Sequence, residues 1–190
     1  MLVSGRARTS VLAVSCMLLT ACATTSQSPP DRSYSGRFSA TTTAGEKREN
    51  ISGRFNLEIR GSQQILDLLS PLGTTVARIE VEPSGARATG SQMQEVRGPN
   101  ADVLTEQLLG WTLPVSGLAD WIEGRPAPER FARVERDAGR VVLIEQDGWT
   151  IRLAEPFEST SRPRRLLLER AAAANTPAVT LRLVVDEPAG

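Results

Sequence analysis

The sequence predicts a mainly β protein, a partly open antiparallel barrel with a short α-helical lid. Three observations predict this fold class: apolar and polar residues alternate strictly in several segments, turn-forming residues separate these segments, and helical periodicity occurs in mid-chain. A sheet with one apolar face must curl on itself or be covered, and two short helices cannot fill a wide sheet. An ordinary packed core beneath the same helices is the alternative.

The first 21 residues have the layout of an export signal. Two arginines precede an uncharged run from Val11 to Leu19, which is shorter than the roughly 20 residues that a membrane-spanning helix needs. The run ends in LTAC, the lipobox pattern, in which a peptidase cuts just before a cysteine that carries diacylglycerol. We therefore expect residues 1–21 to be removed and Cys22 to be the lipidated first residue.

The mature chain divides into a tether and one domain. Residues 22–32 hold the lipidated terminus and a Ser/Thr/Pro-rich stretch without apolar periodicity, which predicts a flexible tether. Residues 33–190 are enough for one domain with a sizeable core. No disulfide is possible, because Cys16 leaves with the signal and Cys22 carries lipid. Removing two arginines lowers the basic residues from 22 to 20 against 22 acidic ones, which excludes a nucleic-acid-binding protein.

Strand periodicity is clearest between residues 50 and 60. Ile51, Gly53, Phe55, Leu57 and Ile59 fall on one face, and the polar residues between them fall on the other. The same alternation recurs over residues 77–82, 149–153 and 179–185. Turn signals separate these segments at spacings that suit hairpins, so one large antiparallel sheet is expected.

Helical periodicity predicts two short helices in the middle of the chain. Asn100 is the expected N-cap of the first, and Leu104, Leu108 and Trp111 form its apolar stripe. The second is expected from Ser116 to Glu123, with Leu118, Trp121 and Ile122 apolar and Gly124 ending it. We expect these stripes and the inward strand residues to bound one apolar cavity, formed by Phe55, Leu57, Ile59, Ile79, Leu104, Leu108, Trp111, Leu118, Trp121, Ile122, Trp149 and Ile151.

The composition argues against catalysis. The chain has no histidine, which excludes Ser-His-Asp, Cys-His and histidine metal sites. Acidic residues are plentiful, but none lies in a run that resembles an acid/base pair, and no glycine-rich phosphate loop follows a strand. We expect no enzyme activity, no cofactor and no metal site.

One turn has an unusual residue at its tip. In Ser70-Pro71-Leu72-Gly73, proline suits the second position of a β-turn and glycine the fourth, so Leu72 occupies the third. Its side chain either folds back onto the core or points outward. In the second case, burial of this leucine in acyl chains would contribute about 1.5–3 kcal/mol.

Taken together, these stretches resemble the outer-membrane lipoprotein receptor family LolB over nearly the whole chain. The matching segments, in order, are LTAC, SGRF (35–38), GRF (53–55), SPLG, LLGWTLPVSGLADWIEGRP (108–126) and QDGWTIRL (146–153). Two positions depart from the family pattern. Leu57 stands where the family tends to carry tryptophan, and the chain reads VVD (184–186) where a C-terminal tryptophan is common.

The resemblance implies an unclosed antiparallel β-barrel, or half-barrel, with an α-helical lid over a hydrophobic cavity. It implies a lipid-anchored protein of the outer membrane that faces the periplasm, accepts cargo lipoproteins from the carrier LolA and inserts them into outer-membrane phospholipid. In the family the leucine of the PLG turn is the membrane-inserting tip, which is Leu72 here, supported by Pro71 and Gly73. The protein is expected to act as a monomer, without nucleic acid.

Two other functions fit the same residues. A lipid-anchored binding module for a free lipid or another apolar ligand would use the cavity but would need neither an exposed Leu72 nor a docking edge for a carrier. A structural lipoprotein of the envelope would have a packed core and no cavity.

Overall fold

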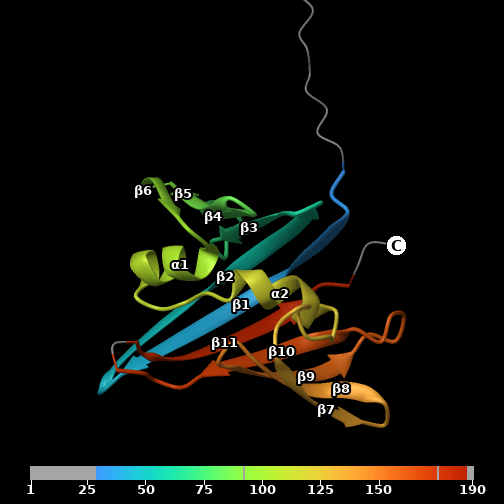
Figure 1. Cartoon of the computed structure of the whole chain (residues 1–190). Coiled ribbons are helices and arrows are strands. Elements are labelled where there is room, and N and C mark those ends of the chain that lie inside the picture. The colour runs from blue at the N-terminus through green and yellow to red at the C-terminus, as the bar shows by residue number, and fades with distance from the viewer. Residues whose placement is uncertain (1–28, 92, 175, 188–190) are drawn as a thin grey trace, which may run out of the picture.

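The computed structural model describes residues 29–91, 93–174 and 176–187, which form one antiparallel sheet of eleven strands and two helices (Figure 1). The strands are β1 (Arg32–Ala44), β2 (Lys47–Arg60), β3 (Gln63–Leu69), β4 (Thr75–Glu82), β5 (Gly85–Gly90), β6 (Met93–Gly98), β7 (Ala132–Asp137), β8 (Arg140–Gln146), β9 (Trp149–Pro156), β10 (Pro163–Arg170) and β11 (Ala178–Val185). Their order in the sheet is β6-β5-β4-β3-β2-β1-β11-β10-β9-β8-β7. β6 and β7 are the two edges of this sheet, so the mainly β, unclosed antiparallel architecture is confirmed.

The long β1–β2 hairpin forms the middle of the sheet. The side chains of β2 show which face of the sheet is buried. Phe55, Leu57 and Ile59 are buried, and the polar residues between them face outward. Ile51 belongs to the same apolar face but is 49% exposed. The reason is that β3 ends at Leu69, opposite Arg54, and so does not extend along β2 as far as Ile51.

Two hydrogen bonds hold the chain at the N-terminal end of β1. The Asp31 amide donates to the Ile59 carbonyl at 2.8 Å, and the Asp31 carboxylate accepts from the Gly61 amide at 2.6 Å. These bonds fix the chain just before Arg32, where β1 starts. The predicted signal peptide and the predicted lipidation site Cys22 lie outside the described residues.

Both helices lie on the same face of the sheet, which curls around them (Figure 1). α1 (Ala101–Leu109) packs against β4, β5 and β6, and α2 (Val115–Ile122) packs against α1 and β10. The predicted N-cap is confirmed, because the Asn100 side chain accepts from the Val103 amide at 2.9 Å. α1 stops two residues before Trp111, because Gly110 adopts a left-handed conformation (φ 74°) and caps the helix.

The last strand is ordered to its end even though the C-terminal tryptophan common in the family is missing. Leu181, Leu183 and Val185 are buried, and the Asp186 amide donates to the Ser35 carbonyl at 2.8 Å. Pairing of β11 with both β1 and β10 therefore holds this segment without the larger side chain.

Candidate functional site

The side chains predicted to bound a cavity gather between the helices and the concave face of the sheet. Eleven of the twelve are buried, and Leu108 is half-buried. They do not all line a hollow, however. Seven of them pack within the core and line neither of the two apolar hollows next to the helices: Leu57, Ile59, Leu104, Trp121, Ile122, Trp149 and Ile151.

The first hollow is a small pocket of about 50 Å³ with an entirely apolar lining. Phe55, Trp111 and Leu118 are the predicted residues that line it. The remaining lining comes from Phe38, Ala40, Ile51, Leu66, Leu68, Leu109, Leu113, Leu181 and Leu183. Strand alternation marks Leu181 and Leu183 as inward residues, whereas Leu66 and Leu68 lie in a short apolar run that gives no face preference.

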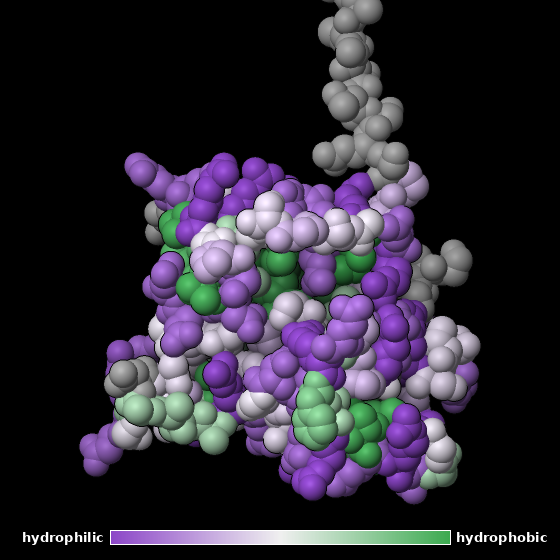
Figure 2. Space-filling view, in the orientation of Figure 1, coloured by the Kyte–Doolittle hydropathy of each residue, from purple (hydrophilic) through white to green (hydrophobic). Residues whose placement is uncertain are grey.

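The second hollow is a groove of about 430 Å³ between α1 and strands β3–β5. Of the predicted residues, Ile79 and Leu108 line it. The other lining residues are Leu68, Val76, Ala77, Ala88, Ser91, Thr105 and Leu109. Leu68 and Leu109 line both hollows, so the C-terminal end of α1 separates the pocket from the groove. In Figure 2 hydrophobic side chains come to the surface beside α1 and again over the β7–β9 corner.

The volumes limit what the site can hold in this conformation. Ligand pockets usually measure about 300–1,000 Å³, a range that includes the groove and excludes the pocket. The two hollows adjoin at Leu68 and Leu109, which line both of them. The second helix of the predicted lid, α2, is held in place by side-chain hydrogen bonds.

A buried amide fixes α2 and the following loop to the sheet. Gln146, at the end of β8, is 3% exposed, and its Oε1 accepts from Trp121 Nε1 at 2.9 Å and from the Ala127 amide at 2.8 Å. Its Nε2 donates to the Ala127 carbonyl at 2.9 Å. Arg130 adds a second link, because its guanidinium donates to Ser116 Oγ at 3.3 Å at the start of α2.

The C-terminal end of α2 is tied to the centre of the sheet through Glu123. Tyr34 Oη donates to Glu123 Oε1 at 2.6 Å, and Arg162 Nη1 donates to the same oxygen at 3.1 Å. Burial, followed by the hydrogen bond to Glu123 and its negative charge, raises the pKa of Tyr34 to about 12. The Arg162 guanidinium also lies 5.9 Å from the centre of the Tyr34 ring.

α1 is held chiefly by apolar packing and by one hydroxyl. Thr105 Oγ1 accepts from the Leu113 amide at 2.9 Å and donates to the Ala101 carbonyl at 2.8 Å. In the first turn, Asp102 Oδ1 is buried and has no hydrogen-bond partner among the described residues. Burial raises the pKa of Asp102, and the nearby Asp147 carboxylate adds to the effect. α1 therefore lacks a polar anchor comparable with Gln146.

The SPLG turn places Leu72 in solvent, with its side chain 96% exposed. The Gly73 amide donates to the Ser70 carbonyl at 2.9 Å, which closes the turn, and Gly73 adopts a positive φ of 90°. The Ser70 amide donates to the Thr74 carbonyl at 2.8 Å. The turn thus supports the leucine without burying it.

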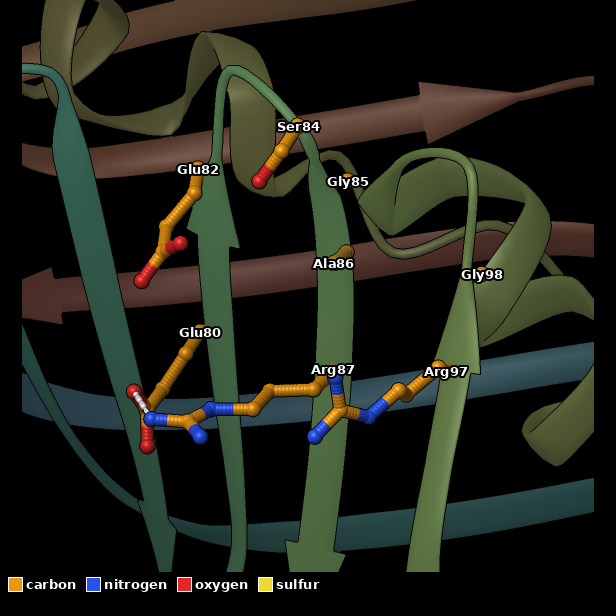
Figure 3. Close-up of a pocket in the computed structure, with 8 residues that line it drawn as sticks. All are labelled: Glu80, Glu82, Ser84, Gly85, Ala86, Arg87, Arg97 and Gly98. Atoms are coloured by element: carbon orange, nitrogen blue, oxygen red, sulfur yellow. Dashed lines mark hydrogen bonds and ion pairs between the residues drawn. The ribbon is translucent and has the colours of Figure 1, made fainter.

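A polar groove of about 190 Å³ lies on the outer side of β4–β6 (Figure 3). Its carboxylates are engaged, since Glu80 accepts from Arg87 and Glu82 Oε1 accepts from Gln63 Nε2 at 3.0 Å. Arg97, on β6, pairs with Glu95 at 2.6 Å. We interpret this groove as a solvated, ion-paired surface.

Among the residues that the structure describes, no three acidic, cysteine or histidine side chains come close enough together to hold a metal ion. No helix in this part of the chain is long and apolar enough to cross a membrane.

Comparison with known proteins identifies the family of this chain. Residues 31–187 match the family described as outer membrane lipoprotein LolB. The outer-membrane lipoprotein LolB of Cupriavidus pinatubonensis is 40% identical over 186 residues, covering 90% of this chain and 89% of that protein. Its namesake from Thiobacillus denitrificans is 40% identical over 141 residues, covering 74% of this chain and 72% of that protein. A LolA superfamily protein from Nitrosomonas europaea aligns structurally over 83% of this chain and 86% of its own, with a TM-score of 0.47 and 12% identity. The chain belongs to the LolB family of outer-membrane lipoproteins.

Proposed function

We propose that this protein is a lipid-anchored receptor that accepts lipoproteins from the periplasmic carrier LolA and inserts them into the outer membrane. The observation that carries the proposal is an apolar pocket and groove beside an exposed leucine turn, in a member of the LolB family. Cys22 carries the anchor, the domain faces the periplasm as a monomer, and Leu72 enters the phospholipid.

The hollows suit the acyl chains of a cargo lipoprotein. An acyl chain exposed to water would cost on the order of 10 kcal/mol, at about 0.8 kcal/mol per methylene, so a receptor must shelter it. The groove offers about 430 Å³ at once, and the pocket adds to it when Leu109 moves aside. Since α2 is hydrogen-bonded to β8 and to β1, α1 is the half of the lid that moves.

No catalytic residue is needed for this transfer. Cargo moves forward if the receptor holds acyl chains more tightly than the carrier does, and the bilayer holds them more tightly still. Each step then releases free energy without nucleotide hydrolysis.

The test is to mix the lipid-anchored protein in liposomes with LolA that carries a labelled lipoprotein. We expect the label to leave the carrier, bind the receptor and then enter the liposomes. If the protein binds free phospholipid but takes no cargo from LolA, a free-lipid binding module is the better description. If it binds neither, it is a structural lipoprotein.

A further inference from the structure

We propose that the mouth of the two hollows is itself the bilayer-contact surface, so that acyl chains pass directly from the groove into lipid beside Leu72. This inference rests on the proposed function and adds a portal to it. The portal is bounded by Ile51, Val76 and Leu109, which we call the rim.

The rim residues are exposed apolar side chains that border the hollows. Ile51 is 49% exposed and lines the pocket, Val76 is 44% exposed and lines the groove, and Leu109 is 42% exposed and lines both. Leu109 shares the pocket with Ile51 and the groove with Val76, so the three side chains border adjoining hollows. Exposed apolar side chains that lie close together are typical of an interaction surface.

Strand register places the SPLG turn at this opening. Leu69 pairs with Arg54 on one side and with Thr75 on the other, so residues 70–74 project from the end of the β3–β4 hairpin. The register shifts next to this pair, because Leu68 pairs with Ala77, and Val76 is left as the extra residue of a β-bulge. The bulge explains how Val76 and its neighbour Ala77 both line the groove.

The backbone of the turn is suited to an apolar environment. Pro71 has no amide hydrogen, and the amides of Ser70, Gly73 and Thr74 all donate within the turn, the last to Ser70 Oγ at 3.2 Å. Three of the four amide N–H groups in residues 70–74 are thus bonded, and that of Leu72 has no acceptor among the described residues. Hydrocarbon offers no replacement for lost hydrogen bonds, so a turn that already satisfies most of its amides enters it at a lower cost. This favours lipid as the occupant of the surface over a protein partner.

The segment between Cys22 and β1 has enough residues to allow this contact. Arg32 pairs with Ile59, five residues along β2 from Arg54, a separation of about 17 Å at roughly 3.4 Å per residue. The nine residues from Ala23 to Asp31 span up to about 30 Å when extended. An anchor on Cys22 and the rim can therefore reach one bilayer together.

The test uses environment-sensitive fluorophores on single cysteines in the full lipid-anchored protein. The mature chain offers no other thiol for labelling, because Cys22 is the anchor. Ile51→Cys, Val76→Cys and Leu109→Cys report on the rim, and Leu72→Cys reports on the tip. Matched controls are Phe131→Cys, which is 92% exposed beside the opposite edge of the sheet, and Val103→Cys, which is 37% exposed on α1 and lines neither hollow.

In liposomes of phosphatidylethanolamine and phosphatidylglycerol, a quencher on the acyl chains should reduce the emission of the tip and rim probes and leave both controls unchanged. Quenching at the tip alone would overturn the portal while leaving the proposed function intact. Quenching at neither tip nor rim would overturn the proposed insertion of Leu72 into the bilayer as well as the portal. Equal quenching at the controls, or shielding of the rim by LolA instead of lipid, would also overturn the portal.

Discussion

The indole Nε1 of Trp121 donates to the Oε1 of Gln146 at 2.9 Å, which joins α2 to β8 in the interior of the barrel. Gln146→Leu leaves the Trp121 N–H and both backbone groups of Ala127 without this partner. Each buried polar group left unsatisfied costs about 1–3 kcal/mol, so urea denaturation should show a loss of at least that size.

Gln64→Leu is the matched control for this loss. The Oε1 of Gln64 is buried and has no hydrogen-bond partner among the described residues, so its replacement should leave the stability unchanged or raise it. Equal losses in the two variants would mean that the Gln146 hydrogen bonds do not anchor α2.

Leu72→Glu should separate the two halves of the transfer. Folding and loading from LolA should be nearly unchanged, because the side chain is 96% exposed and lines neither hollow. Release into liposomes should fall, since charged residues resist hydrocarbon by roughly 2.5–3.5 kcal/mol on insertion scales. Each half-reaction is measured with labelled cargo, and Phe131→Glu serves as the control for release. Equal loss in both halves, or in neither, would show that Leu72 has no specific insertion role.

Trp111 should report the arrival of an acyl chain. It lines the small pocket, whereas Trp121 and Trp149 line neither hollow. Adding an acyl-chain analogue should change the tryptophan emission of the wild type, and Trp111→Phe should remove most of that change. A response that persists in Trp111→Phe would place the acyl chain elsewhere.

The chain has one tyrosine, so the titration of Tyr34 can be read directly from tyrosinate absorbance. Its pKa should be about 12 in the folded protein and near 10 in urea. Folding therefore favours the protonated phenol, and this contribution to stability is complete below pH 10 and is lost as the pH rises toward 12.

Tyr34→Phe should reduce the free energy of unfolding by about 1.5–3 kcal/mol near neutral pH, because the lost hydrogen bond goes to a carboxylate. The difference from wild type should shrink between pH 10 and 12. A difference independent of pH over this range would show that the phenol titrates normally.

Mass spectrometry of membrane-extracted protein should find an acylated N-terminal peptide that begins at Cys22. Cys22→Ser should abolish the modification, and Cys16→Ser should leave it intact, because Cys16 lies within the predicted signal peptide. An unmodified mature terminus at another residue would contradict the lipobox.

The sequence by itself determined the features that depend on neighbours along the chain. Alternation at Phe55, Leu57 and Ile59 identified the buried face of β2, and Asn100 identified the start of α1. These two predictions are correct because strand periodicity and helix capping are local properties of the backbone.

Only the tertiary structure decided which buried residues pack and which line a hollow. Leu57 and Phe55 have the same sequence pattern, yet only Phe55 lines the pocket. Likewise, the exposure of Ile51 depends on where β3 ends, and the anchoring of α2 depends on Gln146, which follows Trp121 by 25 residues in the chain. Volumes and long-range hydrogen bonds arise from contacts between distant segments, and no local pattern encodes them.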